Sequence, residues 1–194
     1  MKSFSSMQIE LNEAKFKLPR GEKELKRDAT KVGSSKVQKT NVRIVAATNV
    51  NMFEAIQKWT SEDKPYLGIC VGYQLIFEKS VESPSTEGLA ILPGTVKRFP
   101  DVDLKIPHMG WNSISPSHPD DGLWKDMPAN PFFYFVHSYY PEPSDTEHIA
   151  ASCDYAVSFA AAVRRGNLVA TQFHPEKSQH NGLQLLRNFL AVTS

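Results

Sequence analysis

The chain has 194 residues, of which 41% are hydrophobic and 10% aromatic, and this composition predicts a globular protein rather than a disordered one. Its 22 Lys and Arg nearly balance 21 Asp and Glu, so the charge gives no indication of a nucleic-acid or acidic membrane partner. No apolar run approaches the roughly 20 residues that cross a bilayer, and the basic amino terminus lacks the apolar stretch of a signal peptide. Together with only two cysteines, Cys70 and Cys153, this predicts a cytoplasmic protein without a disulfide framework.

The first part of the chain differs in charge and texture from the rest. Residues 1–40 contain ten Lys and Arg against five Asp and Glu, and they have no clear apolar period. A β-branched run at Val42–Ala47 predicts a buried strand that ends in a polar loop. Asn51 is placed to cap a helix over Met52–Trp59, in which apolar side chains recur on one face.

From Lys64 onward the pattern is that of an α/β fold, because a strand, a sharp turn and a helix are followed by hairpins. The predicted elements are a strand at Pro65–Ile69, a turn at Cys70–Gly72, a helix at Tyr73–Lys79, strands at Leu89–Phe99, Ile106–Ile114 and Phe132–Tyr140, a hairpin of Phe159–Arg164 with Leu168–Phe173, and a closing helix at Gly182–Val192. A loop with a short helix is expected at residues 120–130.

A cysteine stands between two glycines at the junction of the first strand and helix, in Gly68-Ile-Cys70-Val-Gly72. This is the pattern of a nucleophile elbow, in which we expect both glycines to be required because a Cβ would clash in so tight a turn. The helix amino terminus, including the Val71 N–H, would stabilise a thiolate and an oxyanion. The alternative is a buried structural cysteine, which is the role expected for Cys153 because it has no such turn.

A cysteine nucleophile needs a base, and the base needs an orienting partner. His174 follows a predicted strand, and Glu176, two residues on, can fold back beside its imidazole. His137 is a rival base, but it lies inside a β run and is expected to be a hydrogen-bonded histidine of the sheet, as is His108. Solvated loop positions are expected for His118, His148 and His180, and no Cys or His spacing resembles a metal site.

The segments Gly68–Gln74 and Gln172–Glu176 together resemble the paired signature of the class I (triad-type) glutamine amidotransferases. That resemblance implies a flavodoxin-like α/β fold with a mixed sheet. Three further segments resemble the glutaminase subunit of imidazole glycerol phosphate synthase, an enzyme of histidine biosynthesis: Lys105–Asn112, Tyr134–Tyr139 and His174–Leu190. The resemblance runs from about Ile56 to the end of the chain.

The resemblance implies a catalytic triad that releases ammonia from glutamine without a cofactor or metal. Cys70 would attack the side-chain amide of glutamine, His174 would protonate the departing ammonia, and Glu176 would orient His174. The Val71 N–H would contribute to the oxyanion hole. The positions that match the glutamine pocket are Gln74, Glu82 and the backbone of His137, Ser138 and Tyr139.

The same resemblance implies a partner, a cyclase subunit with a (βα)8-barrel fold, with which the chain would form a heterodimer. Ammonia would pass across that interface instead of escaping into water. The positions that match the interface and the ammonia passage are Tyr134, Lys177, Trp111 and Asn112.

Residues 1–55 depart from the family, whose members begin with a strand, a helix and a second strand ending in a Pro-Gly-x-Gly loop that donates to the oxyanion hole. We therefore divide the chain into an atypical segment, 1–55, and an amidotransferase domain, 56–194, with the first family strands missing or replaced. The loss of one oxyanion donor lowers catalytic rates by about 10²–10³, so the expected glutaminase is an impaired one.

Residues 7–50 instead resemble part of the ATPase domain of sigma-54-dependent transcriptional activators, with Asn49 at its nucleotide-sensing position. No Gly-x-x-x-x-Gly-Lys loop is present, so this segment is not expected to hydrolyse ATP. We favour the interpretation in which Val42–Ala47 takes the place of a missing sheet strand.

Three alternatives stay open on the sequence alone. The chain could be the glutaminase subunit of an anthranilate or aminodeoxychorismate synthase, which share the triad but fit the Gly110-Trp111-Asn112 segment less well. It could be a weakly active or non-catalytic chain that binds the partner only. The third and least favoured is a transcription-related module.

Overall fold

The computed structural model describes residues 52–193. The predictions of a strand at Val42–Ala47, a cap at Asn51 and a sensor at Asn49 lie outside these residues, as does the resemblance of residues 7–50. The predicted division at residue 55 falls inside the first described helix, α2 (Met52–Ser61), and stays a prediction.

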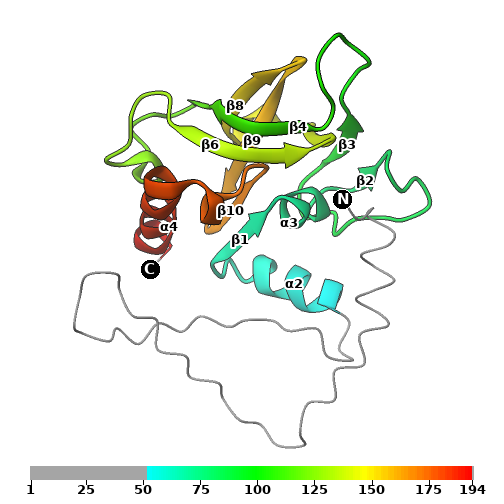
Figure 1. Cartoon of the computed structure of the whole chain (residues 1–194). Coiled ribbons are helices and arrows are strands. Elements are labelled where there is room, and N and C mark those ends of the chain that lie inside the picture. The colour runs from blue at the N-terminus through cyan, green and yellow to red at the C-terminus, as the bar shows by residue number, and fades with distance from the viewer. Residues whose placement is uncertain (1–51, 194) are drawn as a thin grey trace, which may run out of the picture.

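The order of elements is a strand–helix unit followed by a largely antiparallel region (Figure 1). After α2 come β1 (Tyr66–Ile69), α3 (Val71–Leu75), β2 (Lys79–Ser80), β3 (Gly94–Arg98), β4 (His108–Ser113), β5 (Ser115–Pro116), the 3₁₀-helix η1 (Gly122–Trp124), β6 (Phe132–His137), β7 (Tyr139–Pro143), η2 (Thr146–His148), β8 (Ile149–Tyr155), β9 (Val157–Arg165), β10 (Leu168–Thr171), η3 (Pro175–Lys177) and α4 (Gln179–Val192).

The main sheet has the strand order β1-β10-β9-β8-β5 and is mixed, as expected. Strand β1 runs parallel to β10, and the other neighbours in this sheet are antiparallel. A second sheet has the order β2-β3-β7, and β4 pairs with β6 in a separate two-stranded ribbon. Figure 1 shows this ribbon in the upper part of the view and α2 in the lower part, with β1 and β10 between them. The α/β class is therefore confirmed.

The helix predicted at Tyr73–Lys79 is wrong in its extent, because α3 ends at Leu75. The carbonyl groups at its end are taken by a later segment instead of by further helical N–H groups. Leu89 donates to the Leu75 carbonyl at 2.8 Å, and the N–H groups of Ile91 and Leu92 donate to the Ile76 carbonyl at 2.9 and 3.0 Å. The same bonds keep residues 89–92 out of the sheet, so the strand predicted at Leu89–Phe99 is reduced to β3.

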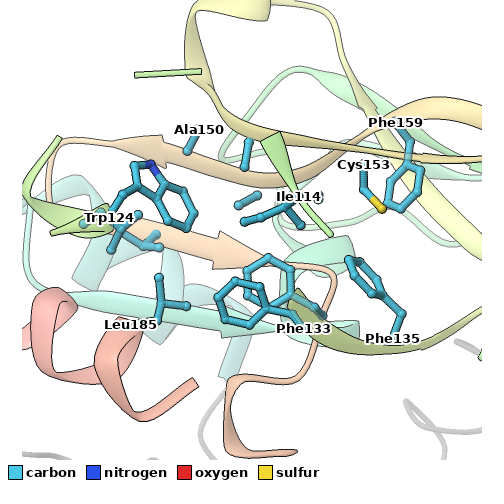
Figure 2. Close-up of a cluster of buried hydrophobic side chains, with 14 of the residues drawn as sticks. Ile114, Trp124, Phe133, Phe135, Ala150, Cys153, Phe159 and Leu185 are labelled. Atoms are coloured by element: carbon cyan, nitrogen blue, oxygen red, sulfur yellow. The ribbon is translucent and has the colours of Figure 1, made fainter. Parts of the chain in front are cut away.

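One core cluster fills the space between the β4–β6 ribbon, the main sheet and α4. Figure 2 shows its aromatic side chains, with Phe133 and Phe135 from β6 and Phe159 from β9. Cys153 lies in this cluster opposite Phe159 of the neighbouring strand, and burial raises the pKa of its thiol to about 12. The predicted structural role of Cys153 is therefore confirmed.

A second core cluster supports the turn that carries Cys70. It is built from completely buried side chains of α3 and the residues after it, among them Tyr73, Ile76 and Phe77, and from Val163 and Ala170 of the main sheet. The apolar face of α2 packs against it through Phe53 and Ile56, as the helical period predicts. This packing holds α3 against the sheet, and at the usual 25 cal/mol per Å² of buried apolar surface each such side chain contributes about 1.5–3 kcal/mol.

Candidate active site

Cys70 occupies a strained turn where β1 ends and α3 begins. Its φ of 53° and ψ of −102° lie in a region that residues with a side chain rarely adopt. Its N–H donates to the Thr171 carbonyl at 2.8 Å, and its carbonyl accepts the N–H groups of Tyr73 and Gln74, both at 3.1 Å. The turn is thus fixed from the sheet on one side and from α3 on the other, as an elbow requires.

Of the two glycines, only Gly68 is required by close packing. A Cβ there would lie 2.9 Å from the Gly72 carbonyl oxygen and 3.0 Å from the Ala170 Cβ. A Cβ on Gly72 would meet only the Tyr66 hydroxyl, at 3.8 Å, which is an ordinary contact. The prediction that both glycines prevent a clash is therefore wrong for Gly72, because this residue lies in the first turn of α3 with open space beside its Cα.

His174 and Glu176 form the predicted pair. The His174 Nδ1 lies 2.6 Å from Glu176 Oε1, and because a carboxylate can only accept, Nδ1 carries the proton. The Nε2 atom is therefore the acceptor, and it is buried without a hydrogen-bond partner among the described residues. The backbone of His174 is held by the Tyr134 carbonyl at 2.9 Å and by the Ser178 hydroxyl at 2.6 Å. A buried basic nitrogen with no partner is what a general base requires.

The parallel pairing of β1 and β10 brings the cysteine and the histidine to the same edge of the sheet. Burial raises the pKa of Cys70 to about 11, and the charge of Glu176 acts in the same direction. The Val71 N–H and Lys177 act in the opposite direction and lower the pKa. At neutral pH the sulfur is therefore a thiol, and its use as a nucleophile depends on the removal of its proton.

Gln172 is a residue of this site that the sequence patterns did not indicate, although it lies in the same motif as His174. Its side chain is completely buried, and its Nε2 lies 3.8 Å from Cys70 Sγ. Gln74, which was predicted to bind glutamine, donates from Nε2 to Gln172 Oε1 at 3.1 Å and to the Tyr139 carbonyl at 2.9 Å. Gln74 therefore lies next to Cys70, and its role toward glutamine stays a prediction.

His137 and His108 have the hydrogen-bonded roles expected of them. His137 Nδ1 lies 2.8 Å from the Tyr139 carbonyl, so it carries the proton, and His137 Nε2 accepts from His108 Nδ1 at 3.0 Å. Burial lowers the pKa of His137 to about 3 and that of His108 to about 4. Both nitrogens of His137 are engaged and the ring stays neutral, so His137 does not serve as the base.

Two further residues were predicted for the glutamine pocket, Ser138 and Glu82. The Ser138 carbonyl accepts the Phe99 N–H at 3.1 Å. Glu82 is half buried in the turn after β2, where its N–H donates to the Ser80 hydroxyl at 3.2 Å. Their contact with glutamine stays a prediction.

The predicted interface residues of β4 and β6 lie on two different faces of the ribbon. Trp111 and Tyr134 are directly paired, and their rings meet edge to face at 6.2 Å between centroids. Asn112 points to the other face, where its amide lies 3.3 Å from His108 Nε2 and donates to the Asp154 carbonyl at 3.1 Å. Lys177 is exposed in η3. The structure thus brings Trp111 and Tyr134 together but turns Asn112 inward.

Neither a metal site nor a membrane span is found in the part of the chain that the structure describes. Residues 52–193 contain no group of three His, Cys, Asp or Glu side chains that could hold a metal ion. None of their helices is long and apolar enough to cross a bilayer. The prediction that the family's Pro-Gly-x-Gly loop is missing concerns residues before the described range.

A cysteine on an elbow, with a His–Glu pair at the end of the neighbouring parallel strand of a mixed sheet, is the arrangement of a triad amidotransferase. The family model described as glutamine amidotransferase class-I matches residues 44–192, so the chain belongs to this family. Among its curated relatives are the imidazole glycerol phosphate synthase subunit HisH of Methylococcus capsulatus, 49% identical, and that of Acinetobacter baylyi, 50% identical. These matches cover 71% and 66% of this chain.

The chain spans less than two thirds of these relatives, namely 66% of the first and 63% of the second. Solved structures confirm the fold. A glutamine amidotransferase has a TM-score of 0.53 at 20% identity and covers 73% of this chain and 68% of its own. PurLQS from Thermotoga maritima has a TM-score of 0.54 at 14% identity, with 74% of this chain and 68% of its own covered.

Replacing Gly68 by Ala should disrupt the elbow, because the new Cβ meets backbone and the Ala170 side chain. We expect a loss of stability of about 1–3 kcal/mol, as for other overpacked sites, measured by urea unfolding. The matched control is Gly72→Ala, which has room for its Cβ and should be neutral or stabilising by about 0.5–1 kcal/mol. Equal effects of the two substitutions would contradict this account of the turn.

Histidine NMR tests the neutral His108–His137 pair. The ¹⁵N shifts should show protonated Nδ1 in both rings and no charging between pH 8 and pH 5.5. Because their pKa values are lowered in the folded state, the unfolded chain binds more protons in acid, and the free energy of unfolding should fall as the pH falls below about 6.5. An Nε2-protonated His137 would contradict the derived hydrogen-bond directions.

Proposed function

We propose that this chain is a glutaminase subunit that hydrolyses glutamine to glutamate and ammonia and delivers the ammonia to a cyclase subunit of imidazole glycerol phosphate synthase. The observation that carries the proposal is the buried Nε2 of His174, which has no hydrogen-bond partner among the residues that the structure describes, while its Nδ1 is held by Glu176 at the sheet edge where Cys70 follows β1. The names of the relatives at 49–50% identity support the histidine-pathway assignment.

The proposed reaction has two half-reactions, and the triad takes part in both. Cys70 Sγ attacks the amide carbon of glutamine while its proton passes to His174 Nε2, and the Val71 N–H faces the developing oxyanion. The carbon–nitrogen bond then breaks, and the proton on Nε2 leaves with ammonia. Water next attacks the thioester and gives a proton to Nε2, the carbon–sulfur bond breaks, and the proton returns to Cys70. Glu176 keeps the imidazole in the required tautomer throughout.

Glutamine would bind beside Cys70, with Gln74, Glu82 and the backbone of residues 137–139 around it. The hydrogen bonds of the Gln74 side chain to the Tyr139 carbonyl and to Gln172 Oε1 both use Nε2, so its Oε1 would be the atom that accepts from glutamine. The proposal needs no cofactor or metal, since the nucleophile, base and orienting carboxylate are all side chains of this chain. The cytoplasm is the proposed location, because Cys70 and Cys153 are both free thiols, as a reducing compartment favours.

The partner would bind to the outward face of the β4–β6 ribbon. Strand alternation places Met109, Trp111, Phe132, Tyr134 and Val136 on that face, and the first three are 55%, 47% and 53% exposed. An apolar, aromatic surface of this kind is typical of a protein interface. A (βα)8-barrel cyclase is the partner that the family assignment favours, in a heterodimer with Lys177 and Asn112 near the ammonia passage.

A second candidate function is a chain that docks to the partner without hydrolysing glutamine. It is favoured by the raised pKa of Cys70, about 11, to which the charge of Glu176 contributes. A thiol of this kind reacts only if the base and the substrate together displace its proton.

Glutamate release in the presence of the cyclase separates the two candidates. We expect glutamate above the blank with the natural chain, none with Cys70→Ala, and continued release with Cys153→Ala, since Cys153 lies in the core away from the turn. An enzymatic assay of glutamate measures all three. Comparable release by Cys70→Ala would refute the triad, whereas a stable complex without glutamate would establish the docking function.

Isothermal titration calorimetry with the cyclase tests the docking face. Trp111→Asp should raise the dissociation constant at least tenfold, because a central aromatic side chain commonly dominates an interface. The matched control is Leu183→Asp, since Leu183 is also 47% exposed but lies on α4, outside the β4–β6 ribbon. Equal binding by the two variants would place the interface elsewhere.

A further inference from the structure

A buried amide group lies behind Cys70, and the triad mechanism does not use it. Gln172 directly follows β10, and its N–H donates to the Ala161 carbonyl at 2.8 Å, so its backbone is fixed to β9. The side chain is completely buried and lies between Cys70 Sγ, at 3.8 Å from Nε2, and the amide of Gln74. A buried polar group in a core position contributes through its hydrogen bonds rather than through apolar packing.

The orientation of the Gln172 side-chain amide follows from the Tyr139 carbonyl, which is the acceptor at the other end of this series of hydrogen bonds. The Tyr139 carbonyl can only accept, so the group that Gln74 turns toward it is its NH₂. The same NH₂ reaches Gln172 at 3.1 Å, and the atom that receives it must be the Gln172 oxygen. The NH₂ of Gln172 is then left to face Cys70 Sγ.

We propose that Gln172 is a positioning residue for the nucleophile, whose side-chain N–H donates to Cys70 Sγ and stabilises the thiolate, with its direction set by Gln74 and the Tyr139 carbonyl. The inference rests on the proposed function in one respect, that Cys70 is the nucleophile. It adds a side-chain donor on the side of the sulfur toward the core, in addition to the Val71 N–H at the helix amino terminus. Charge-assisted hydrogen bonds are stronger than neutral ones, so the donor favours the thiolate over the thiol.

Alkylation of Cys70 by iodoacetamide tests the inference without glutamine or a partner. The rate is measured between pH 7.5 and 11.5, a range that includes the Cys70 pKa of about 11, from the mass of the Cys70 peptide, which also separates Cys70 from Cys153. Gln172→Met keeps the volume but removes the donor, and we expect alkylation at a fixed pH to slow on the order of tenfold, with a rise of the thiol pKa of about one unit. Gln172→Glu should slow it further, because a carboxylate beside the sulfur repels the thiolate.

The matched control is Gln179→Glu, which adds the same charge at an exposed position and should alkylate at the natural rate. Folded Gln172 variants with the natural rate and pH profile would overturn the proposal. If the variants do not unfold cooperatively, the ¹⁵N shift of the Gln172 side-chain NH₂ decides the matter in the natural sequence. It should move between pH 9 and 11.5, as Cys70 ionises, and it should stay constant in Cys70→Ser. A shift that is the same in both proteins would also overturn the proposal.

These measurements follow the thiol alone. A chain that releases no glutamate can still show the dependence of Cys70 on Gln172, and a working glutaminase can lack it. The failure of the inference is therefore distinguishable from the failure of the proposed function.

Discussion

The parallel contact between the ends of β1 and β10 is the constraint on which the site depends. It is closed by the hydrogen bond from the Cys70 N–H to the Thr171 carbonyl, at 2.8 Å, immediately after the last paired residues of the two strands. Because Gly68 lacks a Cβ, the first turn of α3 can approach β1 so closely that the Gly72 carbonyl occupies that space. The nucleophile and the His–Glu pair then leave adjacent strands at the same edge, without any long loop to place them.

The Tyr139 carbonyl joins this edge to the outer ribbon. It accepts from Gln74 on one side, at 2.9 Å, and from His137 on the other, at 2.8 Å. From His137 the hydrogen bonds continue through His108 to Asn112, on the strand that also carries the exposed Trp111. The Tyr139 carbonyl, which can only accept, thereby sets the donor and acceptor roles of the side chains from Asn112 to Cys70. These roles require His108 and His137 to be neutral, because each ring accepts one hydrogen bond. The proposed docking face and the nucleophile thus belong to one continuous hydrogen-bonded unit.

The sequence was sufficient to predict the parts of the site that local chemistry determines. The elbow at Cys70, the pairing of Glu176 with His174, the hairpin of β9 and β10 and the closing helix follow from short patterns of residues. The early end of α3 does not, because it depends on N–H groups of residues 89–92, which no local propensity relates to the carbonyls of residues 75 and 76. The orientation of Gln172 was likewise hidden, since it is set by a carbonyl 33 positions earlier in the chain, at Tyr139. The room for a Cβ at Gly72 could not be predicted either, because it depends on how the backbone of α3 runs past Tyr66.

Burial of the sulfur has two opposed consequences for a glutaminase. Desolvation raises the pKa of Cys70 to about 11 and so opposes the thiolate that would attack glutamine in the proposed reaction. The same protonated state protects the sulfur, because oxidants and alkylating agents react with thiolates far faster than with thiols. Nε2 of His174 has no hydrogen-bond partner within residues 52–193, and in the proposed reaction it would take the proton of Cys70 only when a carbonyl carbon is in place to be attacked, since the proton then moves as the new bond forms. In the proposed reaction, a buried thiol that shares a sheet edge with the Nε2 atom of His174 would therefore link reactivity to substrate binding.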